Sequence, residues 1–208
     1  MPAGPDPPKR NEGKSGLSDF SKNLQESIAV LASLAELEPT LLRVAERCAK
    51  SLNGGGKLLV CGNGGSAAEA MHLVGELVGR YKRDRHPLAA ISLGTDSVLT
   101  TCVGNDFSFD DIFSRQLRAL ARPGDVLVVF STSGRSRNVV AALEAAAEIG
   151  LPSVAFLGHD GGDAAGLASE SLLVRHSDTA RIQEGHQVLL HSLMDLLEAA
   201  LDDARQMS

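Results

Sequence analysis

Two polar residues and a glycine-rich loop within residues 57–81 have the types and spacing needed for acid–base chemistry on an anion. His72 and Glu76 are four positions apart, so in a helix their side chains share one face. The loop at 62–66 (GNGGS) precedes this helix and follows the short apolar run 57–61. A helix start of this kind favours anions, because backbone N–H groups and the positive end of the helix dipole point at it. The arrangement predicts chemistry on a small phosphorylated molecule.

A second loop of the same kind, residues 131–136 (STSGRS), follows the apolar run 125–130 (DVLVVF). Ligands of open α/β sheets bind beyond the carboxyl ends of strands, and hydroxyls and N–H groups suit phosphate oxygens. A plain turn with a helix cap is the alternative, but the density of hydroxyls favours phosphate binding. The loop at 62–66 has neither the dinucleotide spacing nor the Lys of a Walker loop, so nothing supports NAD or ATP. The candidate phosphate-binding residues are Asn63, Gly64, Ser66, Ser131, Thr132, Ser133 and Ser136.

Acid–base and metal candidates lie on two predicted helices. Glu76 stands among small and apolar residues, which would favour a general base, although a solvated surface carboxylate is the common case. A His and a Glu one helical turn apart also form half of a plausible metal site. On the last helix, Gln183 and His191 are eight residues apart, roughly 12 Å of rise, which is long for one ion bound by one chain. His186 fits beside Gln183 better by spacing, so the sequence leaves open which histidine acts.

Two further residues are candidates for substrate binding. Asp96 follows one predicted strand and precedes a helix, so it either caps that helix or contacts substrate hydroxyls. Arg80 lies one turn beyond Glu76, where it either binds substrate or forms an exposed salt bridge.

The elements that must position these residues alternate between strand and helix. Apolar runs predict strands at 57–61, 88–93, 125–130, 152–157 and 171–174. Helical patterns follow at 17–36, 40–52, 66–81, 96–103, 109–121, 137–149 and 181–204, with a turn at 104–106. This alternation predicts an α/β fold: a three-layer α-β-α sandwich around a five-stranded parallel sheet, flavodoxin-like, with additional N-terminal helices.

Composition limits the function classes. The 208 residues are 43% hydrophobic but only 3% aromatic, which suits an aliphatic core of one domain, residues 17–208. The Pro-, Gly- and Lys-rich stretch 1–16 predicts a disordered tail. A net charge of −6 argues against nucleic acid, and no apolar run is long enough for a membrane span. Three cysteines without a zinc spacing fit a reducing cytoplasm.

Five sequence strings together resemble the phosphoheptose isomerases of the sugar isomerase (SIS) domain family over about residues 17–204. They are CGNGGSAAEAMH, GELVGRY, GNDFSFDDIFSRQL, STSGRS and RIQEGHQVLLH. The resemblance implies a ketose–aldose isomerase that interconverts sedoheptulose 7-phosphate and D-glycero-D-manno-heptose 7-phosphate, the first step toward the heptose of bacterial surface polysaccharide. It also implies a cytoplasmic homotetramer with shared active sites.

The resemblance also implies roles for individual residues. Glu76 and His191 match the catalytic pair of the family, and Arg80, Asp96 and Thr132 match positions that touch the sugar. Ser66, Ser131, Ser133 and Ser136 match the phosphate binders. A divalent metal, reported as zinc in some members, would be held by His72, Glu76, Gln183 and His191. One position departs: where some members carry an Asp three residues before Gln183, this chain has Ala180, with Asp178 nearby.

Three other functions compete with this one. A non-catalytic SIS protein that associates with a replication initiator would keep the fold but lack the Glu and the second His, both of which are present here as Glu76 and His191. A sugar-phosphate sensor usually carries a DNA-binding module, for which this chain has no room. An isomerase of a different sugar phosphate is the third alternative.

Overall fold

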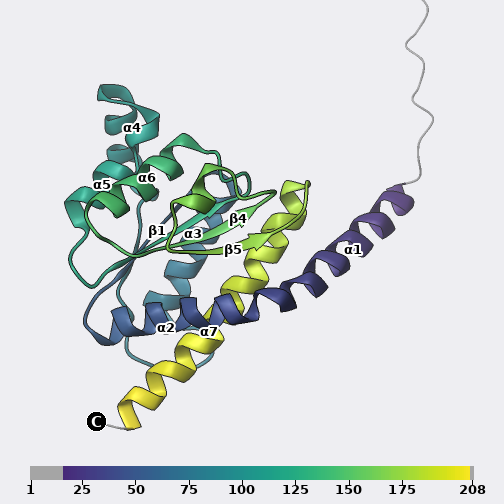
Figure 1. Ribbon diagram of the computed structural model, residues 1–208, viewed down its shortest axis with the longest axis horizontal. Helices are drawn as coiled ribbons and strands as arrows, with labels where there is room; N and C mark the ends of the chain where they lie inside the picture. Colours follow the sequence, from purple (N-terminus) through teal and green to yellow (C-terminus); the bar gives the residue numbers. More distant parts are fainter. Residues whose placement is uncertain (1–15, 207–208) are drawn as a thin grey trace, which may run out of the picture.

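A parallel sheet between two layers of helices forms the body of the protein. The computed structural model describes residues 16–206 of the chain. Its five strands are β1 (Leu58–Gly62), β2 (Ala90–Ser92), β3 (Val126–Ser131), β4 (Ser153–Gly158) and β5 (Glu170–Val174). All neighbouring strands pair in parallel, in the order β2-β1-β3-β4-β5 (Figure 1). Each predicted strand is therefore confirmed, and so is the three-layer α/β fold.

The helices agree with the sequence predictions apart from their ends and from the division of one predicted helix. They are α1 (Gly16–Ser33), α2 (Glu38–Asn53), α3 (Gly65–Val78), α4 (Ser97–Asp106), α5 (Ser114–Leu120), α6 (Arg137–Glu148) and α7 (Thr179–Gln206). Short 3₁₀ turns occupy Leu34–Leu37, Phe109–Asp111 and Asp163–Gly166. No helix of the described chain is long and apolar enough to cross a membrane.

Three details of the helix predictions are corrected. Residues 104–106 were expected to form a turn, but they belong to the last part of α4. The helix expected at 109–121 is divided into a 3₁₀ turn and α5, because Ile112 and Phe113 separate the two. α3 ends at Val78 rather than at Tyr81. Turn-forming residues are weak signals where packing and local hydrogen bonds sustain a helix. The predicted tail at 1–16 lies outside the described residues, apart from Gly16.

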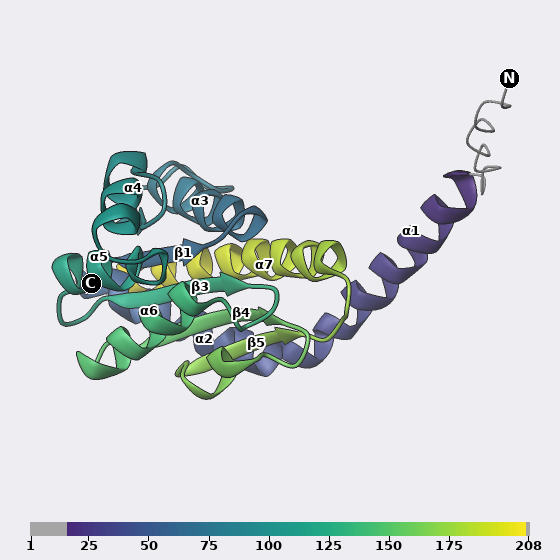
Figure 2. The ribbon, with the colours of Figure 1, turned by 90° about the horizontal axis from the view of Figure 1, so that it is seen from above.

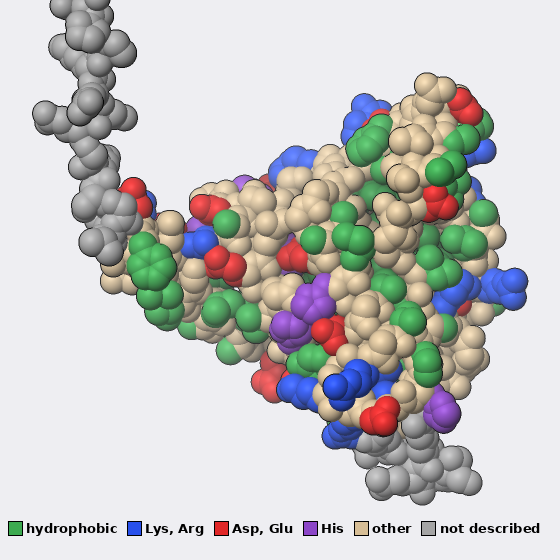
Figure 3. Space-filling view, turned by 180° about the vertical axis from the view of Figure 1, so that it is seen from behind, with side chains coloured by type: hydrophobic (Ala, Val, Ile, Leu, Met, Phe, Trp, Pro, Cys, Tyr) green, Lys and Arg blue, Asp and Glu red, His purple; other side chains and the backbone are tan. Residues whose placement is uncertain are grey.

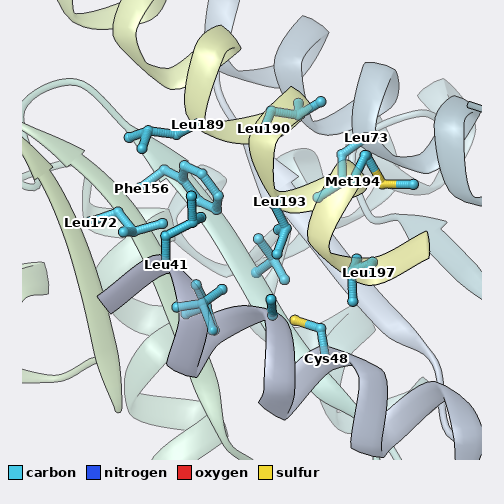
Figure 4. Close-up of a cluster of buried hydrophobic side chains, with 14 of the residues drawn as sticks. Leu41, Cys48, Leu73, Phe156, Leu172, Leu189, Leu190, Leu193, Met194 and Leu197 are labelled. Atoms are coloured by element: carbon cyan, nitrogen blue, oxygen red, sulfur yellow. The ribbon is translucent and has the colours of Figure 1, made fainter. Parts of the chain in front are cut away.

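Both faces of the sheet are covered, which explains why β1, β3 and β4 read as continuous apolar runs. One face packs against α2, α3 and α7. Figure 4 shows part of this cluster, in which side chains from α2, α3 and α7 pack together with Phe156 and Leu172 of the sheet. The other face packs against α4, α5 and α6. α3 and α7 are thus held on the same side of the sheet.

α1 departs from this compact arrangement. Figures 1 and 2 show it projecting away from the body, toward the N-terminal end of the described chain. Its apolar residues Phe20, Leu24, Ile28 and Leu31 are all exposed, Phe20 by 64%. Their spacing of three and four places them in one stripe along the helix.

Candidate active site

The two glycine- and serine-rich loops lie side by side at the carboxyl edge of the sheet. β1 and β3 are neighbours, with Gly62 paired to Phe130, so the loops that follow them leave the sheet together. Asn63 and Asn138 exchange two side-chain hydrogen bonds, Nδ2 to Oδ1 at 2.8 and 2.9 Å. This pair joins the first loop to the start of α6. The N-termini of α3 and α6 therefore converge on one place, as an anion site requires.

The second loop is tightly folded around its glycine. The Oγ of Ser131 accepts a hydrogen bond from the N–H of Gly134, and the Oγ of Ser133 accepts one from the N–H of Arg135. Gly134 has φ of +63°, and a Cβ there would overlap the carbonyl oxygen of Gly161. Only glycine satisfies both conditions. Each hydroxyl keeps its own hydrogen for donation to a phosphate oxygen.

Arg135 turns out to be paired with a carboxylate. Its two terminal nitrogens donate to the two oxygens of Asp160, at 2.8 and 2.6 Å. The hydrogen bond from Arg135 holds the pKa of the Asp160 carboxyl well below its usual range. This contact ties the second loop to the loop that follows β4.

The acid–base candidates form one cluster between α3 and α7. The Nε2 of His72 lies 2.9 Å from Oε1 of Glu76. The Nε2 of Gln187 lies 2.9 Å from Nδ1 of His72 and 3.2 Å from Nε2 of His191. The rings of His72 and His191 meet edge to face, with centroids 5.1 Å apart. Figure 3 shows histidine side chains together with acidic ones on this face of the molecule.

These hydrogen bonds assign the protons of the cluster. If the amide of Gln187 donates, then Nδ1 of His72 and Nε2 of His191 both accept. The hydrogen of His72 is then on Nε2 and points at the Glu76 carboxylate. The carboxylate of Glu76 therefore accepts a hydrogen bond from His72. The Glu76 side chain is 21% exposed, so part of it is still in contact with solvent.

The cluster also fits a metal ion. One ligand atom each from His72, Glu76 and His191 lies within 4.8 Å of the other two. Two imidazole nitrogens and a carboxylate oxygen are donors that Zn²⁺ takes in open, catalytic sites. The donor set and its convergence therefore fit the metal that the resemblance implies.

The two histidines of the last helix that the sequence left open differ in their surroundings. His186 is fully buried, and its Nε2 lies 3.0 Å from the carbonyl oxygen of Leu157, so it is a core residue. His191 is the histidine that faces His72. Gln183 lies two turns before His191 and packs against Gly65. A Cβ on Gly65 would overlap the side-chain amide of Gln183. Gln187 takes the place beside the histidines.

Asp96 and Asp178 act locally as helix caps. The Oδ1 of Asp96 accepts a hydrogen bond from the N–H of Leu99 at the start of α4. Asp178 does the same for Ala180 at the start of α7. Arg80 is exposed immediately beyond the end of α3.

Sequence reasoning missed Asn138, Gln187 and Tyr81. The ring of Tyr81 stacks on that of His191, with centroids 5.9 Å apart. Gln187 is four residues before His191, so helical spacing alone was a usable signal for it. Asn138 carried no such signal, because its partner Asn63 is 75 residues away.

Comparisons with known proteins agree on one family. The family model described as SIS domain matches residues 22–158. A phosphoheptose isomerase of Geotalea daltonii is 52% identical over 191 residues, which cover 91% of this chain and all of that protein. Among solved structures, a phosphoheptose isomerase from Neisseria gonorrhoeae is 40% identical, with a TM-score of 0.84 over 89% of this chain and 100% of its own. One from Francisella tularensis is 33% identical, with a TM-score of 0.86 over 89% and 99% of the two chains.

Proposed function

The chain belongs to the SIS-domain family and within it to the phosphoheptose isomerases, and from this we propose that it isomerises D-sedoheptulose 7-phosphate to D-glycero-D-manno-heptose 7-phosphate. The observation that carries the proposal is the joint presence of two features. A serine-lined pair of loops lies at the start of α3, and the cluster of His72, Glu76 and His191 lies at its end.

The phosphate acts as a handle in this reaction. Ser66, Ser131, Thr132, Ser133 and Ser136 would bind it, together with the N–H groups at the starts of α3 and α6. Asn63 and Gly64 shape the same loop. Ser66 and Glu76 are ten residues apart on α3, about 15 Å of helical rise. An extended seven-carbon chain with its phosphate, together with the reach of two side chains, spans such a separation. Binding at the phosphate thus places C1 and C2 at Glu76.

Proton transfer between C1 and C2 is assigned to Glu76 and His191. The Glu76 carboxylate takes a proton from C1 while His191 gives a proton to the carbonyl oxygen at C2, which yields the enediol. Glu76 then returns its proton to C2, and His191 takes the proton of the hydroxyl at C1, which becomes the aldehyde. Each group ends as it began. His72 and Gln187 orient the pair through the hydrogen bonds described above.

We assign a divalent metal, zinc, to the same cluster. It would be held by His72, Glu76 and His191, and when bound it polarises the carbonyl and stabilises negative charge on oxygen. The sequence prediction adds Gln183 as a ligand. Because Gln183 is about 12 Å of helical rise from His191, it would have to come from a second subunit, whereas Gln187 is within reach in the same chain.

Arg80 and Asp96 are assigned to the hydroxyl groups of the sugar. Both side chains are exposed. Arg80 follows the C-terminus of α3, and Asp96 precedes the N-terminus of α4. Asp96 uses Oδ1 for its helix cap, which leaves Oδ2 for a sugar hydroxyl.

A homotetramer with shared active sites fits the shape of the chain. The exposed apolar stripe of α1 projects from the body and would be covered by other copies (Figure 2). We place the protein in the cytoplasm, where its three free thiols stay reduced and where ADP- or GDP-heptose is made for lipopolysaccharide and related surface polysaccharides.

The direct test is to incubate the purified protein with sedoheptulose 7-phosphate, fructose 6-phosphate and ribulose 5-phosphate in separate reactions, and to identify the products by mass spectrometry and NMR. Conversion of the heptulose alone supports the proposal, and preferential conversion of a shorter ketose phosphate contradicts it. The non-catalytic alternative, an SIS protein associated with a replication initiator, is not supported by the comparisons, whose relatives carry the isomerase name.

A further inference from the structure

The connection between α3 and β2, residues 79–89, lies along α7. The ring of Tyr81 stacks on His191, Lys82 pairs with Asp195 at 2.6 Å, and Arg85 pairs with Glu198 at 3.1 Å. The partners at 191, 195 and 198 lie on successive turns of one face of α7. This connection therefore follows the helix that carries His191, directly after leaving the helix that carries Glu76.

Arg85 is the buried member of this set. Its side chain is 7% exposed and that of Glu198 is 3% exposed. Besides binding Glu198, its guanidinium donates to the backbone carbonyl of Glu76 at 2.6 Å and to that of Leu77 at 2.8 Å. Both carbonyls belong to the last turn of α3, where they have no partner within the helix. The carbonyl of Leu77 also accepts from the N–H of Leu88 at 3.0 Å, so that of Glu76 depends more on Arg85. Arg85 thus caps α3 at the residue that carries the proposed base.

We propose that Arg85 and Glu198 are positioning residues, which hold the backbone of Glu76 against α7 so that its carboxylate faces His191. The expected effect on kcat rests on the proposed function, whereas the expected position of the Glu76 side chain does not. One guanidinium donates to the carboxylate of Glu198 on α7 and to two carbonyls of α3, and it also donates to the carbonyl of His86 within the connection, at 3.3 Å. Glu198 is seven residues from His191, so the two side chains lie on the same side of α7. The Arg85–Glu198 pair therefore lies on the side of α7 that carries the proposed proton-transfer residue His191.

Only arginine can make this set of contacts. A guanidinium presents five N–H donors in a fixed plane, whereas a lysine ammonium is a compact point charge on a flexible stem. Arg85→Lys would keep the ion pair with Glu198 and lose the planar cap on Glu76 and Leu77. The last turn of α3 would then shift relative to α7. A misplacement of about 1 Å in an active site can cost on the order of 10²-fold in rate.

The first experiment compares Arg85→Lys with Lys82→Met. The Lys82–Asp195 pair joins the same two segments, but its side chains are 61% and 49% exposed, so its loss changes little. For Arg85→Lys we expect a fall in kcat of about 10²-fold, with little change in KM. The Tm should fall only modestly, because the ion pair with Glu198 remains while the hydrogen bonds to the two carbonyls are lost. For Lys82→Met we expect wild-type values throughout. An Arg85→Lys variant with the wild-type Tm and wild-type kcat would overturn the proposal.

A second variant separates an effect on catalysis from an effect on folding. Removing one partner of a buried ion pair is costly, but replacing both by apolar residues is often neutral. Arg85→Met combined with Glu198→Leu should therefore fold with a Tm near that of the wild type while kcat stays low. Crystal structures of both variants should show Glu76 moved away from His72 and His191. An unmoved Glu76, or failure of both variants to fold, would refute a positioning role.

If the wild-type protein isomerises no sugar phosphate, the proposed function fails, whereas the position of Glu76 in these structures still decides this inference.

Discussion

Asn63 and Asn138 hold each other's carboxamides across the carboxyl edge of the sheet, with both hydrogen bonds shorter than 3 Å. Asn138 is 2% exposed, so its carboxamide is buried where it bonds to Asn63. The pair joins the first loop to the start of α6, the helix that follows the second loop, and both loops supply the hydroxyls assigned to the phosphate. The quality of phosphate binding should therefore depend on a residue that need not touch the phosphate.

Replacing Asn138 by Ala tests this dependence. The loss leaves the Asn63 amide without its partner, and we expect about 1–3 kcal/mol less stability. KM for the sugar phosphate should rise by about tenfold, equivalent to about 1.4 kcal/mol, with a smaller change in kcat. Thermal unfolding, steady-state kinetics and calorimetric titration with inorganic phosphate measure these effects. A KM equal to that of the wild type would show that the loops are positioned without the pair.

Glu76→Gln removes the proposed base and keeps its shape. We expect turnover to fall by about 10²–10⁴-fold, while the sugar phosphate still binds, because the phosphate loops are intact. A coupled isomerase assay and equilibrium binding separate the two effects. Glu148→Gln is the matched control, since Glu148 is 61% exposed and pairs with Arg118 away from the cluster. Near-normal turnover in Glu76→Gln would assign the base elsewhere.

Metal removal tests the assignment of zinc. Treatment with a chelator should abolish turnover, and added Zn²⁺ should restore it. His72→Ala should lower the metal content measured by atomic emission, because one of three converging ligands is lost. His86→Ala, an exposed histidine outside the cluster, should leave the content unchanged. Full turnover of demonstrably metal-free protein would exclude a role for the metal.

The apolar stripe of α1 should control assembly. Ile28 is 59% exposed on that stripe, and Ile28→Asp would place a charge where another copy is expected to pack. We expect the variant to have a lower mass than the wild type in light scattering after size-exclusion chromatography. Gln25→Asp, which adds a charge at an exposed polar position of the same helix, serves as the control. A wild-type mass for Ile28→Asp would mean that other surfaces hold the subunits together.

The three thiols should differ sharply in reactivity. Burial raises the pKa of the Cys48 thiol to about 12 and that of Cys61 further still, so neither should react in the folded protein. Cys102 is exposed, and its hydrogen bond to Asp106 raises its pKa. A higher pKa means less thiolate at a given pH, so Asp106→Asn should speed its reaction at pH 8. Titration with a thiol reagent should count one thiol in native protein and three in denaturant; a second fast thiol would contradict the burial of Cys48 or Cys61.

Much of the fold was accessible from the sequence, because its signals are local. Each buried parallel strand is a short apolar run between turn residues, and each glycine- and serine-rich loop follows such a run directly. The pairing of His72 with Glu76 also followed from helical spacing alone, and their side chains meet at 2.9 Å.

What only the tertiary structure decided is which face of one helix meets which face of another. Spacing along α7 places Gln183, His186, Gln187 and His191 around the helix axis, but it does not state which side packs against α3. Packing of α7 on the sheet buries His186 and presents Gln187 and His191 to His72. The same reason hides Asn138 and Arg85 from sequence reasoning. Their partners are 75 and 113 residues away, and only the folded chain brings such residues into contact.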